Sequence, residues 1–392
     1  MKIAILGASG VIGAWLTERL LANNIALRII TRGSVGVRLA RYANLDVVSV
    51  DFNDLLSLNK ALDKCDIVVN CIIDKDIQKS NKKKIESNIT IAKNIALASI
   101  NNNISKLIHL SSIVVLPPQI TQNVMNNPYN YSLEKDWYTK AKIETEKIFC
   151  NASSKIQTCI IRPGIVYGPL IPWSIIALSR TKDTIIYLPK KDPSLCYAIH
   201  VDDLARLIYT LIIEKSQLPS LLYGINSERI NWYDFYHEHA KASKTEDEIK
   251  LLPDDEIVNH ITQSNKKSFI KRMITWLLFS PFNEYLARIK PIIYIGKKIK
   301  NGFNLEPVKE QGVINNKTFI KEYLWPTEFE MKLYTSSFEF KPKHNGESLG
   351  FQYKINFREG CENVAQWWNY ELENALNDGL QKMLNLSRTF KF

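Results

Sequence analysis

No apolar run in this sequence is long enough to cross a membrane. A spanning helix needs about 20 predominantly apolar residues, and no stretch of about 18 or more residues is both apolar and uncharged. The first expected strand begins at Lys2, which leaves no room for a signal peptide ahead of it. We therefore expect a cytoplasmic protein.

Cysteine is scarce and scattered. The six cysteines include no Cys-x-x-Cys pair, and no group of His, Cys and Asp has the spacing of metal ligands. This pattern excludes a disulfide framework and a zinc site, and favours reduced thiols in a reducing compartment. We expect no metal.

Negative charge is in deficit, but the deficit is local. The 392 residues carry 51 Lys and Arg against 40 Asp and Glu, and 45% of them are hydrophobic. Residues 266–302 hold nine basic residues and one acidic residue, which is most of the net charge of +11. The rest has the composition of a globular protein, long enough for one large α/β domain and a smaller one.

A glycine-rich turn follows the first apolar run, residues 2–6, and precedes a helical sequence. Strand, glycine turn and helix in this order favour a dinucleotide-binding turn. The first glycine permits a tight turn, the second lets backbone approach a pyrophosphate, and the third lets the helix pack close to the strand. Amides at the helix start then face the phosphates. The expected contacts are Gly7, Ser9, Gly10, Val11, Ile12 and Gly13.

No acidic residue occurs between Glu18 and Asp46. Sites that select NAD usually place Asp or Glu about 20 residues past the glycines, to bind the ribose 2′-hydroxyl. Arg32 lies at the end of the second apolar run instead, where it suits a 2′-phosphate. The sequence therefore favours NADP as cofactor, with NAD as the alternative.

Apolar runs alternate with helical patterns along the first half of the chain. Such runs are typical of a parallel sheet buried on both faces, so we predict an α/β fold with a doubly wound parallel sheet. The expected strands are residues 2–6, 26–31, 45–50, 66–71, 106–110 and 158–161, with helices over 85–100 and 137–149.

Short motifs in a fixed order carry a resemblance to a known family. They are Gly7-x-x-Gly10-x-x-Gly13, Asp51-Phe52, 66–71, Asn88, His109-Leu110-Ser111-Ser112, Tyr138-x-x-x-Lys142, Arg162-Pro163-x-x-x-Tyr167-Gly168-Pro169 and His200-Val201-Asp202-Asp203. With them the chain resembles the short-chain dehydrogenase/reductase superfamily, most closely its extended, epimerase/dehydratase-like branch. The resemblance covers most of residues 1–225 and again about 318–370.

The resemblance implies a Rossmann-type domain, a smaller C-terminal substrate-binding domain and a catalytic set of Ser112, Tyr138 and Lys142. A hydroxyl–ketone interconversion needs an acid/base, and tyrosine at a pKa of about 10 is a poor base. Lys142 follows Tyr138 by one helical turn, so we expect its charge to lower that pKa, and Ser112 to orient the substrate oxygen. Cofactor contacts are expected from Arg32, Asp51, Phe52, Cys71, Asn88, Tyr138, Lys142 and Pro163 besides the glycine turn.

A second Tyr-x-x-x-Lys pattern, Tyr131 to Lys135, competes with the first. Tyr138 is preferred because Lys142 continues into the helix expected of the family, and because its spacing from Ser112 fits better.

Three positions depart from the patterns of related enzymes. Ile113 follows Ser112 where dehydratases carry an acidic pair, which argues against a dehydratase. Ile165 and Cys196 stand where UDP-galactose 4-epimerases carry Asn and Arg near the substrate phosphates. A UDP-sugar held in that manner is therefore in doubt.

The predicted domain division follows the resemblance. The dinucleotide-binding domain comprises 1–170 with 197–225, and the substrate domain comprises 171–196 and 226–392, with a basic, aromatic insertion at about 251–317. Within the insertion, 266–302 is interpreted as a cap over the pocket, or as a helix lying on anionic lipid. We expect no nucleic-acid partner, because no nucleic-acid module accompanies the charge.

Three functions remain open at this point. The first is an NADP-dependent oxidoreductase or epimerase acting on a nucleotide- or carrier-linked sugar. The second is a reductase or dehydrogenase of a hydrophobic alcohol or ketone, such as a sterol-like, lipid or polyketide substrate. The third is a catalytically silent dinucleotide sensor, against which the intact Ser112, Tyr138 and Lys142 count. A small-molecule substrate is expected in the first two cases, and the branch is compatible with a homodimer.

Overall fold

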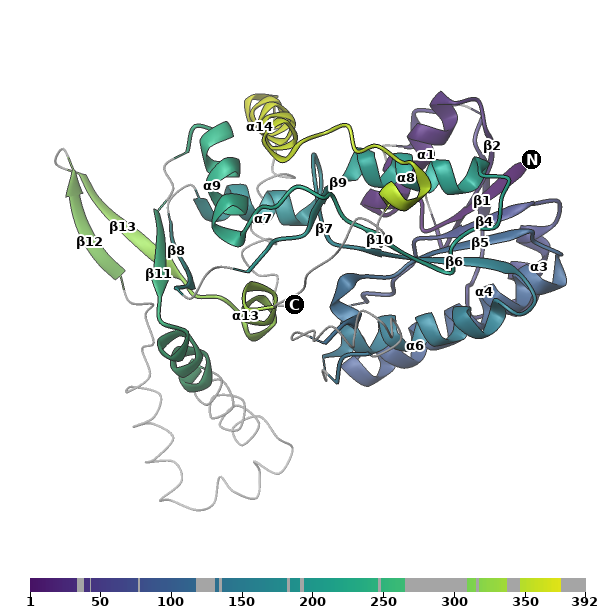
Figure 1. Ribbon diagram of the computed structural model, residues 1–392, viewed down its shortest axis with the longest axis horizontal. Helices are drawn as coiled ribbons and strands as arrows, with labels where there is room; N and C mark the ends of the chain where they lie inside the picture. The colour runs from purple at the N-terminus through teal and green to yellow at the C-terminus, as the bar shows by residue number, and fades with distance from the viewer. Residues whose placement is uncertain are drawn as a thin grey trace, which may run out of the picture.

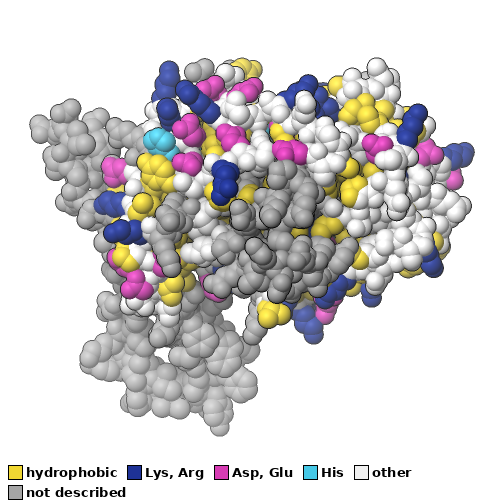
Figure 2. Space-filling model, viewed as in Figure 1, with side chains coloured by type: hydrophobic (Ala, Val, Ile, Leu, Met, Phe, Trp, Pro, Cys, Tyr) yellow, Lys and Arg dark blue, Asp and Glu magenta, His cyan; other side chains and the backbone are white. Residues whose placement is uncertain are grey.

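The computed structural model shows a chain with two sheet-containing parts, a large one at the N-terminal end and a smaller one beside it (Figure 1). The structure describes residues 1–33, 39–42, 44–76, 78–117, 131–133, 136–181, 184–190, 194–245, 248–264, 309–314, 317–336 and 346–374. The basic segment 266–302, with both of its interpretations, lies outside these residues. Figure 2 shows basic and acidic side chains interspersed over the described surface.

The larger part is built on a seven-stranded parallel sheet. In spatial order its strands are β10 (Leu221–Gly224), β6 (Gln157–Pro163), β5 (Lys106–Leu110), β4 (Ile67–Asn70), β1 (Lys2–Leu6), β2 (Ala26–Thr31) and β3 (Asp46–Ser49). Six of these strands follow the order 3-2-1-4-5-6 of dinucleotide-binding folds. The predicted fold class, a Rossmann-type doubly wound sheet, is confirmed.

Helices cover both faces of this sheet because its strands are apolar on both sides. Ile3 and Ile5 face a core that they share with helices α1 (Val11–Ala22) and α8 (Val201–Ile213). Ala4 and Leu6 alternate with them and face α3 (Leu55–Leu62), α4 (Asn81–Asn101) and α6 (Trp137–Ala152). In Figure 1, α1 and α8 lie above the sheet and α3, α4 and α6 below it.

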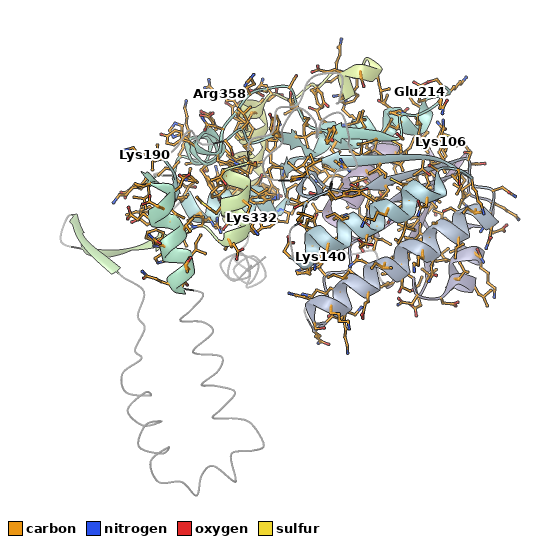
Figure 3. The ribbon with its side chains drawn as sticks, turned by 60° about the horizontal axis from the view of Figure 1, so that its bottom comes forward. Lys106, Lys140, Lys190, Glu214, Lys332 and Arg358 are labelled. Carbon is orange, nitrogen blue, oxygen red and sulfur yellow. The ribbon has the colours of Figure 1, made fainter. Side chains whose placement is uncertain are left out.

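A lysine fixes α8 to the start of β5. The Lys106 ammonium donates to the carbonyl oxygens of Leu211 at 3.3 Å and Ile212 at 3.2 Å, and to that of Glu214. Lys106 and Glu214 lie side by side at the end of the helix in Figure 3. A cation there satisfies the last carbonyls of the helix and opposes its dipole.

The smaller part packs helices against a four-stranded sheet. The helices are α7 (Pro172–Thr181), α9 (Trp232–Ala242), α13 (Glu328–Tyr334) and α14 (Phe357–Asn374). The sheet has the order β11 (Glu248–Leu252), β8 (Thr184–Pro189), β13 (Lys317–Leu324) and β12 (Lys309–Ile314). A short parallel pair, β7 (Ile165–Tyr167) with β9 (Ala198–His200), lies between the two parts.

A C-terminal segment packs against α8 of the larger part. The predicted domain division, which assigns all of 226–392 to the substrate domain, stays a prediction. The Asp203 carboxylate accepts hydrogen bonds from the backbone amides of Lys354 at 3.1 Å and Ile355 at 3.0 Å. Phe351 belongs to the same buried core as Leu207 of α8. This docking joins residues about 150 apart in sequence, and no local pattern marks it.

Among the described residues, no helix combines the length and the apolar character needed to span a bilayer. The same residues contain no group of three or more His, Cys, Asp or Glu side chains able to hold a metal ion.

Candidate active site

The glycine turn after β1 is shaped by contacts that exclude side chains. Gly7 has a φ of 86°, a conformation that favours glycine. A Cβ on Gly13 would lie 2.3 Å from the carbonyl oxygen of Gly7 and 2.8 Å from the Cα of Ala8. The close approach of α1 to β1 therefore requires glycine at residue 13, as the sequence predicts.

The N-terminus of α1 offers backbone amides to an anion. Gly10 caps the helix without a side-chain hydrogen bond, and Ser9 and Gly10 are exposed. Val11 and Ile12 begin the helix, where amides have no partner within the helix and the helix dipole favours negative charge. A helix start without a side-chain cap, beside a glycine-rich turn, fits the pyrophosphate of a dinucleotide. The individual phosphate contacts stay predictions.

The strand exits next to this turn carry three more of the predicted cofactor residues. Asp51 is exposed and accepts a hydrogen bond of 2.9 Å from the backbone amide of Asn53. The Phe52 side chain is only 3% exposed, so only its backbone can face a ligand. The Cys71 amide donates to Leu6, and burial raises the pKa of its thiol to about 12. All three lie at the carboxyl edge of the sheet, where dinucleotides bind.

Asn88 and Pro163 are enclosed by protein. The Asn88 amide oxygen accepts from the Asp74 backbone amide at 2.9 Å, and its nitrogen donates to the carbonyl oxygens of Asp74 at 3.1 Å and Lys84 at 2.8 Å. It thereby holds the connection between β4 and α4. Pro163 is the buried last residue of β6, paired with Gly224. Direct cofactor contacts from Asn88 and Pro163 stay predictions.

Arg32 lies at the exit of β2, as expected, but it has a partner that the sequence does not reveal. Its Nη1 is 3.3 Å from Oδ1 of Asp74, a fully buried carboxylate after β4. The two residues are 42 positions apart and meet only because the sheet brings their strand exits together.

The three predicted catalytic residues come together at the end of β5. Ser112 begins the turn after that strand and accepts a hydrogen bond of 3.3 Å from the Val114 amide. Tyr138 lies in the first turn of α6, close enough to Ser112 for the serine side chain to lower the pKa of the tyrosine. The Lys142 ammonium lies 6.0 Å from the centre of the Tyr138 ring and donates a 2.7 Å hydrogen bond to the carbonyl oxygen of Leu110.

In this arrangement Lys142 is not among the groups that lower the pKa of Tyr138. Burial raises the pKa of Tyr138 to about 12, and the nearby Ser112 side chain opposes this rise. Burial also lowers the pKa of Lys142 to about 8, helped by the like charge of Lys75. Lys142 therefore gives up its proton more readily than an ordinary lysine, and its ammonium is hydrogen-bonded to the carbonyl oxygen of Leu110. Tyr138 is neutral at pH 7.

The competing Tyr131 belongs to a different cluster. The Arg162 guanidinium lies 5.7 Å from the centre of the Tyr131 ring and forms a fully buried ion pair of 2.6 Å with Glu146. Burial raises the pKa of Tyr131. Its pattern partner, Lys135, lies outside the described residues. Tyr131 thus packs on a buried ion pair, whereas Tyr138 meets Ser112.

The three departures noted in the sequence are buried side chains. Ile113 and Ile165 are each 4% exposed, and Cys196 is 1% exposed. Ile165 and Cys196 share one apolar cluster with Trp232. Neither side chain is placed to receive the phosphates of a substrate.

Comparisons with known proteins agree with this architecture. A model of the NAD dependent epimerase/dehydratase family matches residues 3–221, more than half of the chain. The chain is 14% identical to a UDP-glucose 4-epimerase of Thermotoga maritima, solved with UDP-glucose, with a TM-score of 0.61 over 95% of this chain and 100% of that one. It is also 14% identical to a UDP-glucose 4-epimerase of Thermus thermophilus, solved with NAD, with a TM-score of 0.59 over 94% and 99%. Likeness at this identity establishes the fold.

The sequence relatives are named for other activities. The chain is 23% identical to a decarboxylating sterol-4-alpha-carboxylate 3-dehydrogenase of Dictyostelium discoideum, over 43% of this chain and 54% of that protein. It is 24% identical to cinnamoyl-CoA reductase 2 of Medicago truncatula, over 55% and 68%. The match thus spans about half the length of the sterol dehydrogenase. The family match, the strand order and the glycine turn together show that the chain belongs to the NAD dependent epimerase/dehydratase family.

Proposed function

We propose that this protein is an NADP-dependent oxidoreductase that interconverts a hydroxyl and a keto group, with Tyr138 as the acid/base. The observation that carries the proposal is the convergence of Tyr138, Ser112 and Lys142 beside a dinucleotide-binding turn. A bound nicotinamide dinucleotide supplies or accepts the hydride. The chain itself must then move one proton and orient one oxygen.

The raised pKa of Tyr138 suits proton donation. At neutral pH its hydroxyl keeps its proton, so it can give that proton to a carbonyl oxygen as the oxygen gains negative charge. Ser112 can hold the same oxygen by a second hydrogen bond. Lys142 holds the end of β5 beside the tyrosine through its 2.7 Å hydrogen bond to the carbonyl oxygen of Leu110. Reduction of a ketone is therefore the direction for which these groups start in the right protonation state.

NADP is the proposed cofactor, and NAD is the alternative. The motivation is Arg32 at the exit of β2, where recognition of the ribose takes place. Its half-exposed guanidinium can form charge-assisted hydrogen bonds with a 2′-phosphate.

A hydrophobic or carrier-linked ketone is the proposed substrate class. It is favoured because the buried Ile165 and Cys196 stand where UDP-galactose 4-epimerases carry the Asn and Arg side chains near the substrate phosphates. The sterol dehydrogenase and the cinnamoyl-CoA reductases among its relatives act on substrates of that kind by name. A nucleotide- or carrier-linked sugar is the second candidate, favoured by the fold shared with UDP-glucose 4-epimerases.

A substrate panel tests the proposal. We expect oxidation of NADPH, followed at 340 nm, with a 3-ketosteroid or a 3-ketoacyl thioester, and none with UDP-glucose or UDP-galactose. Interconversion of the UDP-sugars without such reduction would support the sugar epimerase instead. Tight cofactor binding with no turnover on any carbonyl would support the silent sensor.

Cytoplasmic localisation, the homodimer and the contact of 266–302 with anionic membrane stay proposals. Co-sedimentation with vesicles of anionic lipid at low and high salt tests the membrane contact, because each basic residue near such a surface contributes about 1 kcal/mol. Protein that stays in the supernatant at low salt would favour the cap.

A further inference from the structure

Arg32, at the exit of β2, forms an ion pair with the Asp74 carboxylate at the exit of β4. Asp74 follows β4, and β1 lies between β4 and β2 in the sheet. The contact of 3.3 Å between Arg32 and Asp74 therefore bridges the two exits that flank the glycine turn. Asp74 is 0% exposed, whereas the Arg32 side chain is 55% exposed. A buried carboxylate thus contacts a long side chain that is partly exposed to solvent.

Asp74 is held in place without help from Arg32. Its Oδ2 accepts hydrogen bonds of 2.5 Å from the Lys79 ammonium and 2.6 Å from the Ser87 hydroxyl. Its backbone amide and carbonyl are both bound by the Asn88 side chain. Since Ser87 and Asn88 lie on α4, the carboxylate is anchored to a helix of the core and faces Arg32 with its other oxygen, Oδ1.

The cluster of Asp74, Lys79 and Arg32 has a net positive charge. Burial alone would raise the pKa of Asp74, but the hydrogen bonds from Lys79 and Ser87 and the charge of Arg32 lower it to about 2. Asp74 is therefore ionised at neutral pH. Lys79 compensates that negative charge, so Asp74, Lys79 and Arg32 together carry one net positive charge. The contact to Asp74 uses Nη1 of Arg32, and a guanidinium has five N–H donors.

We propose that Asp74 is the positioning residue for cofactor selectivity, because it holds the Arg32 guanidinium where the 2′-phosphate of NADP(H) binds. This inference rests on the proposed NADP preference. Long side chains lose rotamer entropy when they bind a ligand, and an anchor that orders Arg32 beforehand reduces that cost. Asp74 itself touches no cofactor atom and acts only through Arg32.

Cofactor titrations on single variants test the anchor. The ratio of the dissociation constants of NADH and NADPH, measured by nicotinamide fluorescence, should fall about tenfold in Asp74→Asn and in Arg32→Ala, which corresponds to about 1.4 kcal/mol. Asp76→Asn is the matched control, because it removes the same charge from an exposed position of the same connection, and its ratio should equal that of the wild type. Lys79→Met should also lower the ratio, because it cancels the net positive charge.

A double variant separates positioning from a general structural effect. Asp74→Asn should change the ratio no further once Arg32 is alanine, because Asp74 acts only through Arg32. A wild-type ratio in Asp74→Asn and Lys79→Met, with the preference lost in Arg32→Ala, would overturn the anchor and leave the NADP preference standing. A wild-type protein that binds NADH as tightly as NADPH would overturn both. If Asp74→Asn does not fold, Ser87→Ala decides, because it removes a hydrogen bond that fixes Asp74 without changing any charge: a lowered ratio supports the anchor and a wild-type ratio overturns it.

Discussion

The Lys142 ammonium donates a 2.7 Å hydrogen bond to the carbonyl oxygen of Leu110, the last residue of β5. Through this bond α6, which carries Tyr138, is tied to the strand that precedes Ser112. The bond also explains why Lys142 is not the source of a lowered tyrosine pKa, since its ammonium is directed to a backbone carbonyl and its own pKa is lowered to about 8 by burial and by Lys75.

Burial of Lys142 should make stability depend on pH. Its pKa is about 8 in the folded protein, below the ordinary value of 10.5, so protonation opposes folding at pH 7 and this cost fades as the pH rises toward 10.5. The cost is about 3 kcal/mol at most. Thermal unfolding of Lys142→Met and of the wild type at both pH values tests this. The Tm of the variant minus that of the wild type should be larger at pH 7 than at pH 10. An equal difference in Tm at both pH values would contradict the lowered pKa of a buried Lys142.

The close packing of α1 on β1 should tolerate no side chain at residue 13. Gly13→Ala puts a Cβ 2.3 Å from a backbone oxygen, which must shift the helix. Overpacking of this kind costs about 1–3 kcal/mol, and the displaced amides should also weaken NADPH binding. Gly33→Ala is the stability control, because a Cβ there meets no atom within 4 Å. Unchanged Tm and unchanged NADPH affinity in Gly13→Ala would show that the turn has room.

The docking of the C-terminal segment should depend on Asp203. Its carboxylate accepts hydrogen bonds from two backbone amides of that segment. Hydrogen bonds to a charged group contribute about 1.5–3 kcal/mol each. Asp203→Asn should lower Tm and speed amide hydrogen exchange at residues 346–357. Asp202→Asn, which loses only a partly exposed ion pair with Arg19, should cost less than about 1 kcal/mol. Equal effects of the two substitutions would show that Asp203 is not the docking group.

The sequence predicts the central strands well because their apolar runs coincide with strands buried on both faces. The strands at 26–31 and 106–110 have the predicted limits. The helix predicted over 85–100 begins earlier, at Asn81, because Ser80 caps a polar first turn that adds nothing to the apolar period. The proximity of Ser112, Tyr138 and Lys142 could be predicted from spacing, since Ser112 follows β5 and the other two lie one helical turn apart at the start of α6.

Contacts between distant segments could not be found in this way. Asp74 lies in a connection without any motif, and its role depends on the strand order that places it beside Arg32. Asp203 looks like a residue of a helix N-terminus, yet His200 caps that helix, and Asp203 binds residues that lie about 150 positions later. The effect of burial on Tyr138 likewise depends on packing that spacing does not specify.

The central claim is that Tyr138 is the proton donor, and the most direct measurement compares the turnover of Tyr138→Phe and Tyr131→Phe. The assay is NADPH oxidation with the carbonyl substrate that the wild type reduces. Loss of one acid/base group costs roughly 10²–10⁴-fold in rate. We predict that loss in kcat for Tyr138→Phe, with an unchanged NADPH dissociation constant, and near wild-type turnover for Tyr131→Phe. Wild-type turnover in Tyr138→Phe, with Tyr131→Phe inactive, would contradict the account.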